Sequence, residues 1–133
     1  MFHNIPIIPV AKGRHRTTKK GHNYTPRKTD TYETQLAFLV KRLFTKPLEG
    51  PLILRVNFYM PRPKYVDKKQ YSCEAIPHDK KPDTSNLLKA FEDALNGIAW
   101  MDDSQIYKVE AVKYYAALGV EPFVSFEVEG EGE

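Results

Sequence analysis

One helix, bracketed on both sides by residues that end regular structure, lies at the centre of this chain. Within the segment from His78 to Asp103, a helical pattern begins at Asp83, after Pro82, and ends at Asn96-Gly97. A proline before the first turn and an Asn-Gly pair after the last are typical helix boundaries. The apolar face of this helix comprises Leu87, Leu88, Phe91, Ala94 and Leu95. The segment therefore predicts a loop, a capped helix and a return to extended chain, with acidic residues at both ends.

The other periodic stretches predict one more helix and several strands. Apolar residues recur at helical spacing over 31–45, and Asp30, just before this stretch, resembles a capping box together with Glu33. Residues 61–81 are charged and aperiodic, so we expect a long loop there. Alternating or apolar patterns predict strands at 52–59, at about 105–115 and at 124–128, with a proline-bearing edge strand at 5–10.

This order of elements predicts a small α/β (α+β) fold with a mixed β-sheet and helices packed on it. A length of 133 residues and 41% hydrophobic content suit a single domain, residues 1–133, with one core. The lone Cys73 excludes an intramolecular disulfide and fits a reducing compartment, and no apolar run approaches membrane-spanning length. We therefore expect a cytoplasmic protein with no membrane partner.

Charge is distributed unevenly along the chain. The net charge is only +3, but residues 1–29 contain no Asp or Glu, whereas the end of the chain, 129–133, is acidic and expected to fray. A basic loop over 12–28 is predicted to contact DNA phosphates, with a solvated and partly disordered arm as the alternative. Its candidate DNA-binding residues are Lys12, Arg14, Arg16, Lys19, Lys20, Arg27 and Lys28.

The acidic residues at the two ends of the central helix suggest a metal site. Asp83 lies where a helix N-terminus attracts anions, and Asp102 and Asp103 follow the helix. Carboxylate oxygens are the ligands that Mg²⁺ prefers, and one or two carboxylates with water and phosphate suffice. Lys89 would offset charge in a transition state. Asn86, Lys89 and Asp93 fall within a sector of roughly 60° of the helix.

Each of these residues also has a purely structural interpretation. Asp83 would serve as a helix N-cap, and Asp102-Asp103 as a solvated turn. Lys89 would pair with Asp93 at i, i+4. His78 is a further candidate metal ligand, or an ordinary loop histidine.

Three blocks of sequence resemble the signature of RusA-type Holliday junction resolvases. The blocks are KPDTSNLLK at 81–89, DALNG at 93–97 and WMDDSQI at 100–106. PVAK at 9–12 and YTP at 24–26 are similar to the opening of the same family. The resemblance thus covers nearly the whole chain.

The resemblance implies a homodimeric, phage- or prophage-type endodeoxyribonuclease with a RusA-like fold. It implies dependence on Mg²⁺, with Mn²⁺ as a possible substitute, and paired nicks in four-way DNA junctions during recombination and repair. Asp83 and Asp103 match the essential carboxylates, Asp102 the neighbouring acid, Lys89 the catalytic lysine and Asn86 the motif asparagine.

One position departs from the family pattern. Ser85 stands where the family often has a second Asp, and a hydroxyl is a weaker metal ligand. The site would then hold Mg²⁺ less tightly, or recruit Asp79, His78 or Asp93 instead. One alternative is therefore a junction-binding homologue that lost catalysis through Ser85. A separate alternative is a metal-dependent enzyme acting on a small phosphorylated substrate.

Overall fold

The computed structural model describes residues 1–13, 16–17, 23–24, 27–69 and 73–130. The chain forms two compact units. The sheet unit contains residues 1–9, 50–81 and 106–133, and the helical unit contains residues 10–49 and 82–105. A mixed five-stranded sheet and three helices among the described residues confirm the predicted α+β class. The single domain stays a prediction.

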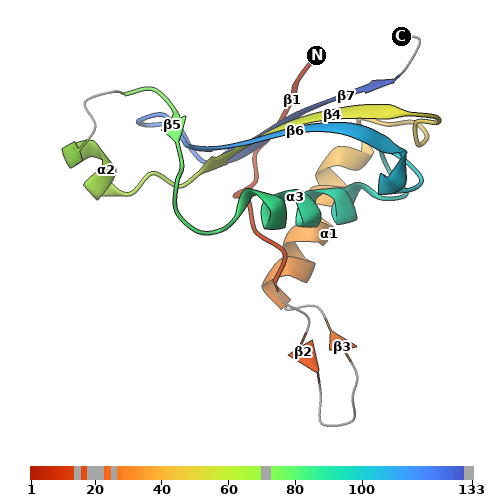
Figure 1. The fold of residues 1–133 in the computed structure, drawn as a ribbon, viewed down its shortest axis with the longest axis horizontal. Coiled ribbons are helices and arrows are strands. Elements are labelled where there is room, and N and C mark those ends of the chain that lie inside the picture. Colours follow the sequence, from red (N-terminus) through yellow and green to blue (C-terminus); the bar gives the residue numbers. More distant parts are fainter. Residues whose placement is uncertain (14–15, 18–22, 25–26, 70–72, 131–133) are drawn as a thin grey trace. The chain divides into compact units, whose positions relative to one another are not determined.

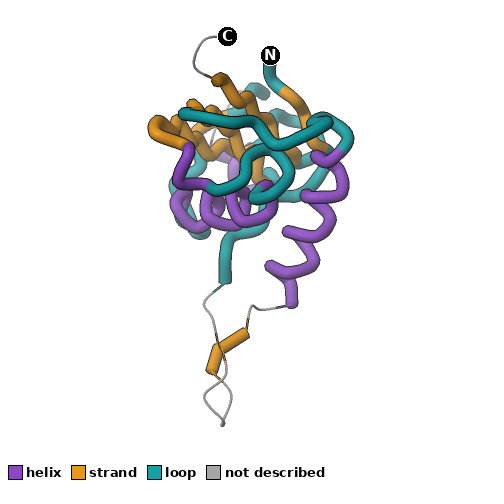
Figure 2. Tube along the Cα trace, turned by 90° about the vertical axis from the view of Figure 1, so that its right-hand side faces the viewer, coloured by secondary structure: helices purple, strands orange, loops and turns teal. Residues whose placement is uncertain are grey.

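The sheet unit is built around strand β4, which has a parallel neighbour on one side and an antiparallel neighbour on the other. The strand order is β1-β7-β4-β6-β5. The β4–β6 pair is parallel, and β1–β7, β4–β7 and β5–β6 are antiparallel. Figure 1 shows β4, β6 and β7 running side by side, and Figure 2 shows the strands of the sheet in orange. The strands are β1 (His3–Ile5), β4 (Leu52–Met60), β5 (Ile76–Pro77), β6 (Ile106–Tyr115) and β7 (Phe123–Gly130), and helix α2 spans Lys64–Lys69.

Strand β4 confirms the strand predicted at 52–59. Its side chains alternate strictly between buried and half-buried positions, because successive side chains point to opposite faces of a sheet. Leu54, Val56 and Phe58 are fully buried, and each such side chain contributes about 1.5–3 kcal/mol through burial. The alternate face carries Arg55 and Tyr59 and stays partly open to solvent.

Arg55 joins three strands on that face. Its guanidinium lies 3.0 Å from Glu110 of β6, and 3.0 Å and 2.8 Å from Glu127 and Glu129 of β7. The Met1 ammonium binds Glu127 at 2.7 Å. Strand β7 therefore continues to Gly130, and the expected fraying of residues 129 and 130 is wrong because Arg55 offsets the acidic charge. Residues 131–133 lie outside the described residues.

Two further predictions in the sheet unit need correction. The first strand spans His3–Ile5 rather than 5–10, because Pro6 ends the run that pairs with β7; it is an edge strand, as predicted. The expected loop 61–81 contains α2, which buries Val66, and β5, which pairs with Tyr114 and Tyr115 of β6. Both elements are too short to give a periodic signal.

The helical unit contains α1 (Arg27–Lys41) and α3 (Thr84–Leu95). Helix α3 begins one residue after the predicted start at Asp83 and ends just before the predicted stop at Asn96-Gly97, but α1 starts earlier and ends earlier than 31–45. Asp30 therefore lies within the first turn instead of capping it, and a turn closed by the 2.8 Å bond from the Leu43 N–H to the Val40 carbonyl ends the helix. The two helices pack on each other. Their buried residues are Thr29, Tyr32, Leu36 and Val40 of α1, and Leu87, Ala90, Phe91, Ala94 and Leu95 of α3.

Two small elements complete the helical unit. Strands β2 (Arg16–Thr17) and β3 (Asn23–Tyr24) pair antiparallel within the expected basic loop. A 3₁₀ turn, η1, spans Asp103–Gln105. Among the described residues, no helix has the length and apolar character needed to cross a bilayer.

Candidate active site

Asp83 occupies the N-cap position of α3 without capping it through its side chain. Its φ and ψ are −67° and 142°, and its carbonyl accepts hydrogen bonds from Asn86 (3.1 Å) and Leu87 (3.2 Å). The side chain is exposed and makes no capping hydrogen bond. The carboxylate thus remains available beside the positive end of a 12-residue helix. The simple N-cap interpretation is not supported by this geometry.

The end of α3 is fixed by a buried tryptophan. Trp100 is fully buried, and its indole N–H donates a 2.7 Å hydrogen bond to the side chain of Asn96. Gly97 adopts a φ of +83°, which disfavours other residues, and its N–H donates to the Trp100 carbonyl at 2.6 Å. These contacts anchor the chain two residues before Asp102.

Gln105 holds the acidic turn that follows. Its side-chain oxygen accepts hydrogen bonds from the N–H groups of Met101 (2.9 Å) and Asp102 (3.1 Å). Its side-chain nitrogen donates to the Leu48 carbonyl at 3.0 Å. The side-chain oxygen and nitrogen of Gln105 are therefore both hydrogen-bonded, and together they position Asp102, which is next to Asp103 in the chain. Sequence reasoning treated Gln105 only as part of a motif block and missed this role.

Asp102 and Asp103 differ in their surroundings. The Ser104 hydroxyl donates a hydrogen bond to the Asp102 carboxylate, and this bond lowers the pKa of Asp102. Asp102 is exposed and Asp103, at the start of η1, is half-buried. The solvated-turn interpretation thus describes Asp102 better than Asp103.

Glu92 is a carboxylate near Asp103 that sequence reasoning missed. Burial and, next, the charge of Asp103 raise the pKa of Glu92 to about 7, although the charge of Lys89 opposes this increase. Glu92 lies three residues after Lys89 and seven after Ser85, so the three share one side of α3. The helical spacing was visible in the sequence, but the proximity of Asp103 and the burial were not.

Lys89 and Lys12 converge on Asp93. The Lys89–Asp93 pair predicted at i, i+4 is confirmed at 3.3 Å. Lys12, only 16% exposed, lies 3.0 Å from Asp93 of α3 and 2.9 Å from Glu33 of α1. Burial of Lys12 opposes its charge, but the hydrogen bonds to Glu33 and Asp93 outweigh burial and raise its pKa. Lys12 thus joins two helices, which differs from the solvent-facing phosphate contact expected of it.

The backbone beside Lys12 is also fixed. The Lys12 N–H donates to the Asn86 carbonyl at 2.9 Å, and the Thr29 hydroxyl donates to Ala11 at 3.3 Å and accepts from Gly13 at 3.1 Å. The segment before the basic region is therefore held against the starts of α1 and α3.

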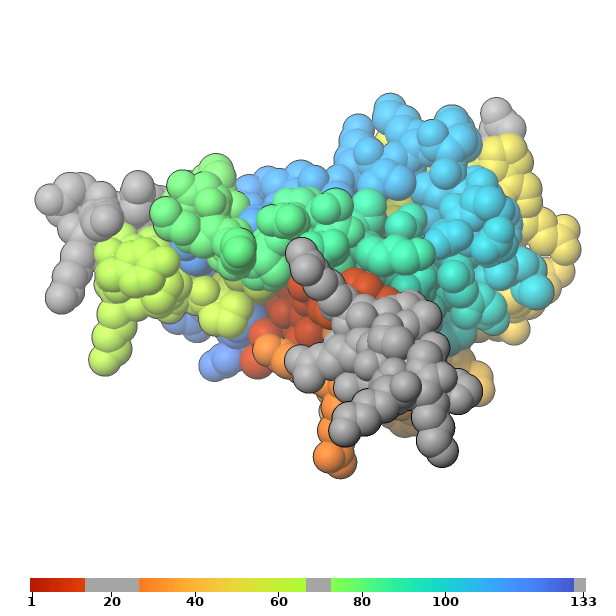
Figure 3. Space-filling view, turned by 60° about the horizontal axis from the view of Figure 1, so that its bottom comes forward, coloured from red at the N-terminus to blue at the C-terminus, as the bar shows by residue number. Residues whose placement is uncertain are grey.

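The remaining candidates, apart from His78 and Asp79, belong to the helical unit. Ser85 and Asn86 are exposed in the first turn of α3, and Arg27 and Lys28 are exposed at the start of α1. Figure 3 shows the solvent-facing atoms of the segment 84–105 in green to cyan. Arg16 is described only by its place in β2. Arg14, Lys19 and Lys20 lie outside the described residues.

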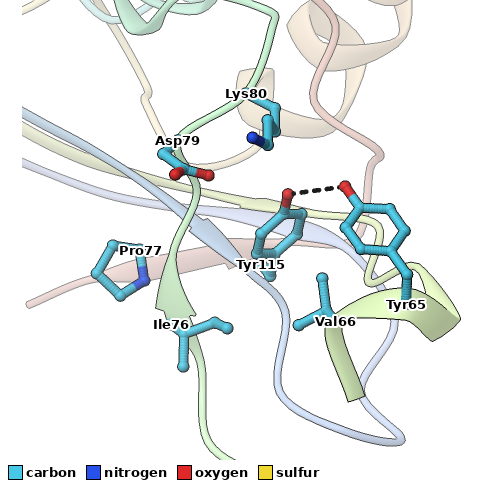
Figure 4. A pocket seen from close by; sticks show the side chains of 7 residues that line it. All are labelled: Tyr65, Val66, Ile76, Pro77, Asp79, Lys80 and Tyr115. Atoms are coloured by element: carbon cyan, nitrogen blue, oxygen red, sulfur yellow. Dashed lines mark hydrogen bonds between the residues drawn. The ribbon is translucent and has the colours of Figure 1, made fainter. Parts of the chain in front are cut away.

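His78 and Asp79 belong to the sheet unit. The His78 N–H donates to Lys113 at 3.0 Å, and its ring lies 4.3 Å from that of Tyr115. Burial and then the charge of Lys113 lower the pKa of His78. Asp79 lines a cavity of about 290 Å³, where Tyr65 and Tyr115 place their hydroxyls 3.3 Å apart (Figure 4). His78 thus has a structural role beside β6.

The chemistry of the candidate donors suits a hard cation. Within the part of the chain that the structure describes, no three His, Cys, Asp or Glu side chains are grouped so as to hold a metal. Mg²⁺ does not require such a group, since it usually keeps several waters and takes one or two carboxylates with substrate phosphate. Asp83 has an available carboxylate, and the mutual repulsion of Asp103 and Glu92 would be relieved by a cation.

Comparison with known proteins defines the family. The sequence model of the endodeoxyribonuclease RusA family matches residues 6–124, and the chain belongs to this family. The chain is also 32% identical over 117 residues to the uncharacterized protein YqaN of Bacillus subtilis (strain 168), a match that covers 81% of this chain and 82% of that protein. The resemblance seen in the three sequence blocks is thereby confirmed, and membership supports a nuclease.

Proposed function

We propose that this protein is a Mg²⁺-dependent, structure-selective endodeoxyribonuclease that resolves four-way DNA junctions by paired nicks. It acts as a homodimer in recombination and repair of phage or prophage type. Family membership supports the reaction class. The observation that carries the assignment of the site is the uncapped carboxylate of Asp83 at the N-terminus of α3. A residue needed only to start the helix would use that carboxylate as a cap.

The residues of the helical unit have different roles in the proposed phosphodiester hydrolysis. Asp83 and Asp103 would hold Mg²⁺, with Asp102 as the neighbouring acid, and Mn²⁺ would serve as a substitute. The bound ion supplies Lewis acidity to the phosphate and lowers the pKa of water. The amide groups at the start of α3 attract the scissile phosphate. Lys89, whose side chain is 57% exposed, offsets the charge that grows on the phosphoryl oxygens.

The basic residues provide contacts to the DNA backbone. Arg27 and Lys28 are exposed at the start of α1, and we place Arg14, Arg16, Lys19 and Lys20 on the same DNA-binding region. Such contacts recognise charge and shape instead of base sequence. Binding of the junction should therefore weaken steeply with salt, whereas a small phosphorylated substrate in a closed pocket would show little salt dependence.

Cleavage of a synthetic four-way junction tests the proposal. Purified protein with Mg²⁺ should introduce symmetric nicks in two opposing strands and leave a linear duplex of the same length uncut. Binding without nicks, at high Mg²⁺ and with Mn²⁺, would instead identify a non-catalytic junction-binding homologue weakened by Ser85.

Replacement of Asp103 separates catalysis from folding. Asp103→Asn should reduce cleavage by at least about 100-fold, because one metal ligand is removed, while junction affinity stays within a few-fold. Asp30→Asn, an exposed residue of α1, is the matched control and should retain activity. Equal loss of binding and cleavage in Asp103→Asn would assign Asp103 a structural role.

A further inference from the structure

One border of the sheet has no strand partner along most of its length. Strand β5 pairs only with Tyr114 and Tyr115 of β6, and the carbonyl of Lys113 accepts from His78. Among the described residues, no strand pairs with 106–112 on that side. Figure 1 shows β6 at this border, with β5 at one end only. An unpaired edge is a template for another chain.

This edge is also exposed and partly apolar. Every residue from Tyr107 to Glu110 is exposed, whereas the neighbouring β4 is alternately buried. Tyr107 is 60% exposed, and Val109 and Val112 are each 38% exposed. Proteins protect such edges with prolines, bulges, charged side chains or a covering element, and the charged residues of 106–112 are Lys108 and Glu110. The outer edge of 106–112 has no proline, and its register irregularity lies only at its start, opposite Leu52/Ile53.

The backbone groups of alternate residues point away from the sheet. The carbonyl of Lys113 faces β5, because it accepts from His78. Both polar groups of a strand residue point to the same side, and sides alternate along the strand. The N–H and C=O groups of Tyr107, Val109 and Ala111 therefore face outward.

We propose that β6 pairs antiparallel with β6 of a second copy of this chain, about a two-fold axis at Val109. Val109 is the midpoint of 106–112, so this register uses the whole available edge and stops before β5. It makes Val109–Val109 and Tyr107–Ala111 the hydrogen-bonded pairs. A two-fold axis at Ala111 would bring the second chain into the place of β5.

The side chains in this register are complementary. Lys108 of one copy lies opposite Glu110 of the other, twice across the axis, which pairs opposite charges. Within one chain, the Lys108 ammonium and the Glu110 carboxylate form a long ion pair of 3.9 Å. Tyr107 lies opposite the small Ala111, and Ile106 lies opposite Val112. A closed, self-complementary contact of this kind is what two-fold symmetry requires.

This inference rests on the proposed function, which requires a homodimer to make paired nicks. It adds the surface through which the two copies associate. Asp103 precedes β6 by three residues. With a rise of about 3.4 Å per residue, the two Ile106 residues would lie about 20 Å apart on opposite sides of the axis. In each copy the acidic turn therefore precedes the interface strand in the chain, and the two strands begin at opposite ends of the interface.

Disulfide trapping tests the register. A hydrogen-bonded antiparallel pair has its Cα atoms about 5.5 Å apart, which suits a disulfide. In a Cys73→Ser background, which removes the lone cysteine, Val109→Cys should form a covalent dimer under mild oxidation at micromolar concentration. Val112→Cys is the matched control: the residue type and exposed fraction are the same, but its two copies would lie about 20 Å apart.

Each outcome decides the proposal. Trapping of Val109→Cys but not of Val112→Cys supports it. Equal trapping of both variants, trapping of neither, or a monomeric mass in light scattering overturns it. Lys108→Glu, which places two like-charged pairs at the axis, should raise the dimer dissociation constant at least tenfold, and Lys41→Glu on α1 should not. An unchanged constant in Lys108→Glu also overturns the register.

The two proposals fail separately. Trapping and mass are measured without DNA, whereas nicking is measured on the junction. Paired nicking by a protein that forms no disulfide at Val109→Cys would contradict the proposed interface and support the proposed nuclease activity. A disulfide-linked dimer that binds the junction but never cuts it would support the interface and contradict the nuclease activity.

Discussion

The backbone N–H of Asp102 donates a 3.1 Å hydrogen bond to the side-chain oxygen of Gln105, three residues later. In return the Gln105 N–H donates to the Asp102 carbonyl, also at 3.1 Å. The same glutamine reaches the Leu48 carbonyl, which belongs to the loop after α1. The acidic turn is thus closed on itself and tied to a distant part of the helical unit.

Removal of that side chain should loosen the turn. Gln105→Ala removes three hydrogen bonds, and at about 0.5–1.5 kcal/mol each we expect a decrease of about 2 kcal/mol in the free energy of unfolding. Urea titration measures it. Cleavage should fall more than junction affinity, because Asp103 is no longer held in position. Gln35→Ala, exposed on α1, is the control; similar effects of both variants would contradict a special role for Gln105.

Glu92 should make stability depend on pH. Its pKa of about 7 in the folded protein exceeds the ordinary 4.5, so its contribution to stability falls as pH rises from about 4.5 to about 7. Glu92→Gln lacks this decrease. Without divalent metal it should therefore be more stable than the parent at pH 8, by about 1 kcal/mol after solvent screening.

The pH profile distinguishes this cause from a change in packing. At pH 4 the Glu92 side chain is mostly protonated in both the folded and the unfolded protein. Its charge should then contribute little to the difference in the free energy of unfolding between Glu92→Gln and the parent. A difference that stays constant from pH 4 to pH 8 would show that the charge of Glu92 plays no part.

Ser85→Asp should strengthen the response to metal. A carboxylate there restores the acidic position of the family pattern, one turn before Lys89 on α3. We expect the Mg²⁺ concentration for half-maximal cleavage to fall several-fold. Ser85→Asn is the matched control, because it adds similar volume without charge. An unchanged metal response in Ser85→Asp would remove residue 85 from the vicinity of the ion.

Lys12 and the pair Arg27 and Lys28 should behave differently. Lys12→Gln breaks ion pairs of 2.9 Å and 3.0 Å and should cost about 2 kcal/mol of stability, with little change in the salt dependence of DNA binding. The double variant Arg27→Gln/Lys28→Gln should keep stability and lower the slope of log affinity against log salt by roughly one for each phosphate that is no longer neutralised. Filter binding at several salt concentrations measures the slope. A lower slope in Lys12→Gln would show that Lys12 contacts a DNA phosphate.

The elements with strong periodicity were predictable from the sequence. Strand β4 and helix α3 follow their apolar patterns almost residue for residue, because one face of each is buried. The start of α1 was not predictable in the same way. Thr29 lies before the expected start, yet it is buried and bonded to Ala11 and Gly13, so tertiary contacts extend the helix.

The candidate site was predictable as a set of residues but not as an arrangement. Asp83 could be placed at a helix start, but the absence of a capping bond depends on its side-chain orientation. The closeness of Glu92 to Asp103 depends on the path of the chain around Trp100. The engagement of Lys12 with Glu33 and Asp93 joins residues far apart in sequence, which no local pattern reveals.

The position of β7 has a consequence for synthesis of the protein. Strand β7 lies between β1 and β4, so the first strand of the chain has no partner in the sheet until the last strand has been made. Domains fold during translation as their segments emerge, at about 5–20 residues per second. On the ribosome, every candidate catalytic residue therefore emerges before the sheet can close. A chain that stops before Phe123 would leave the edges of both β1 and β4 open to aggregation.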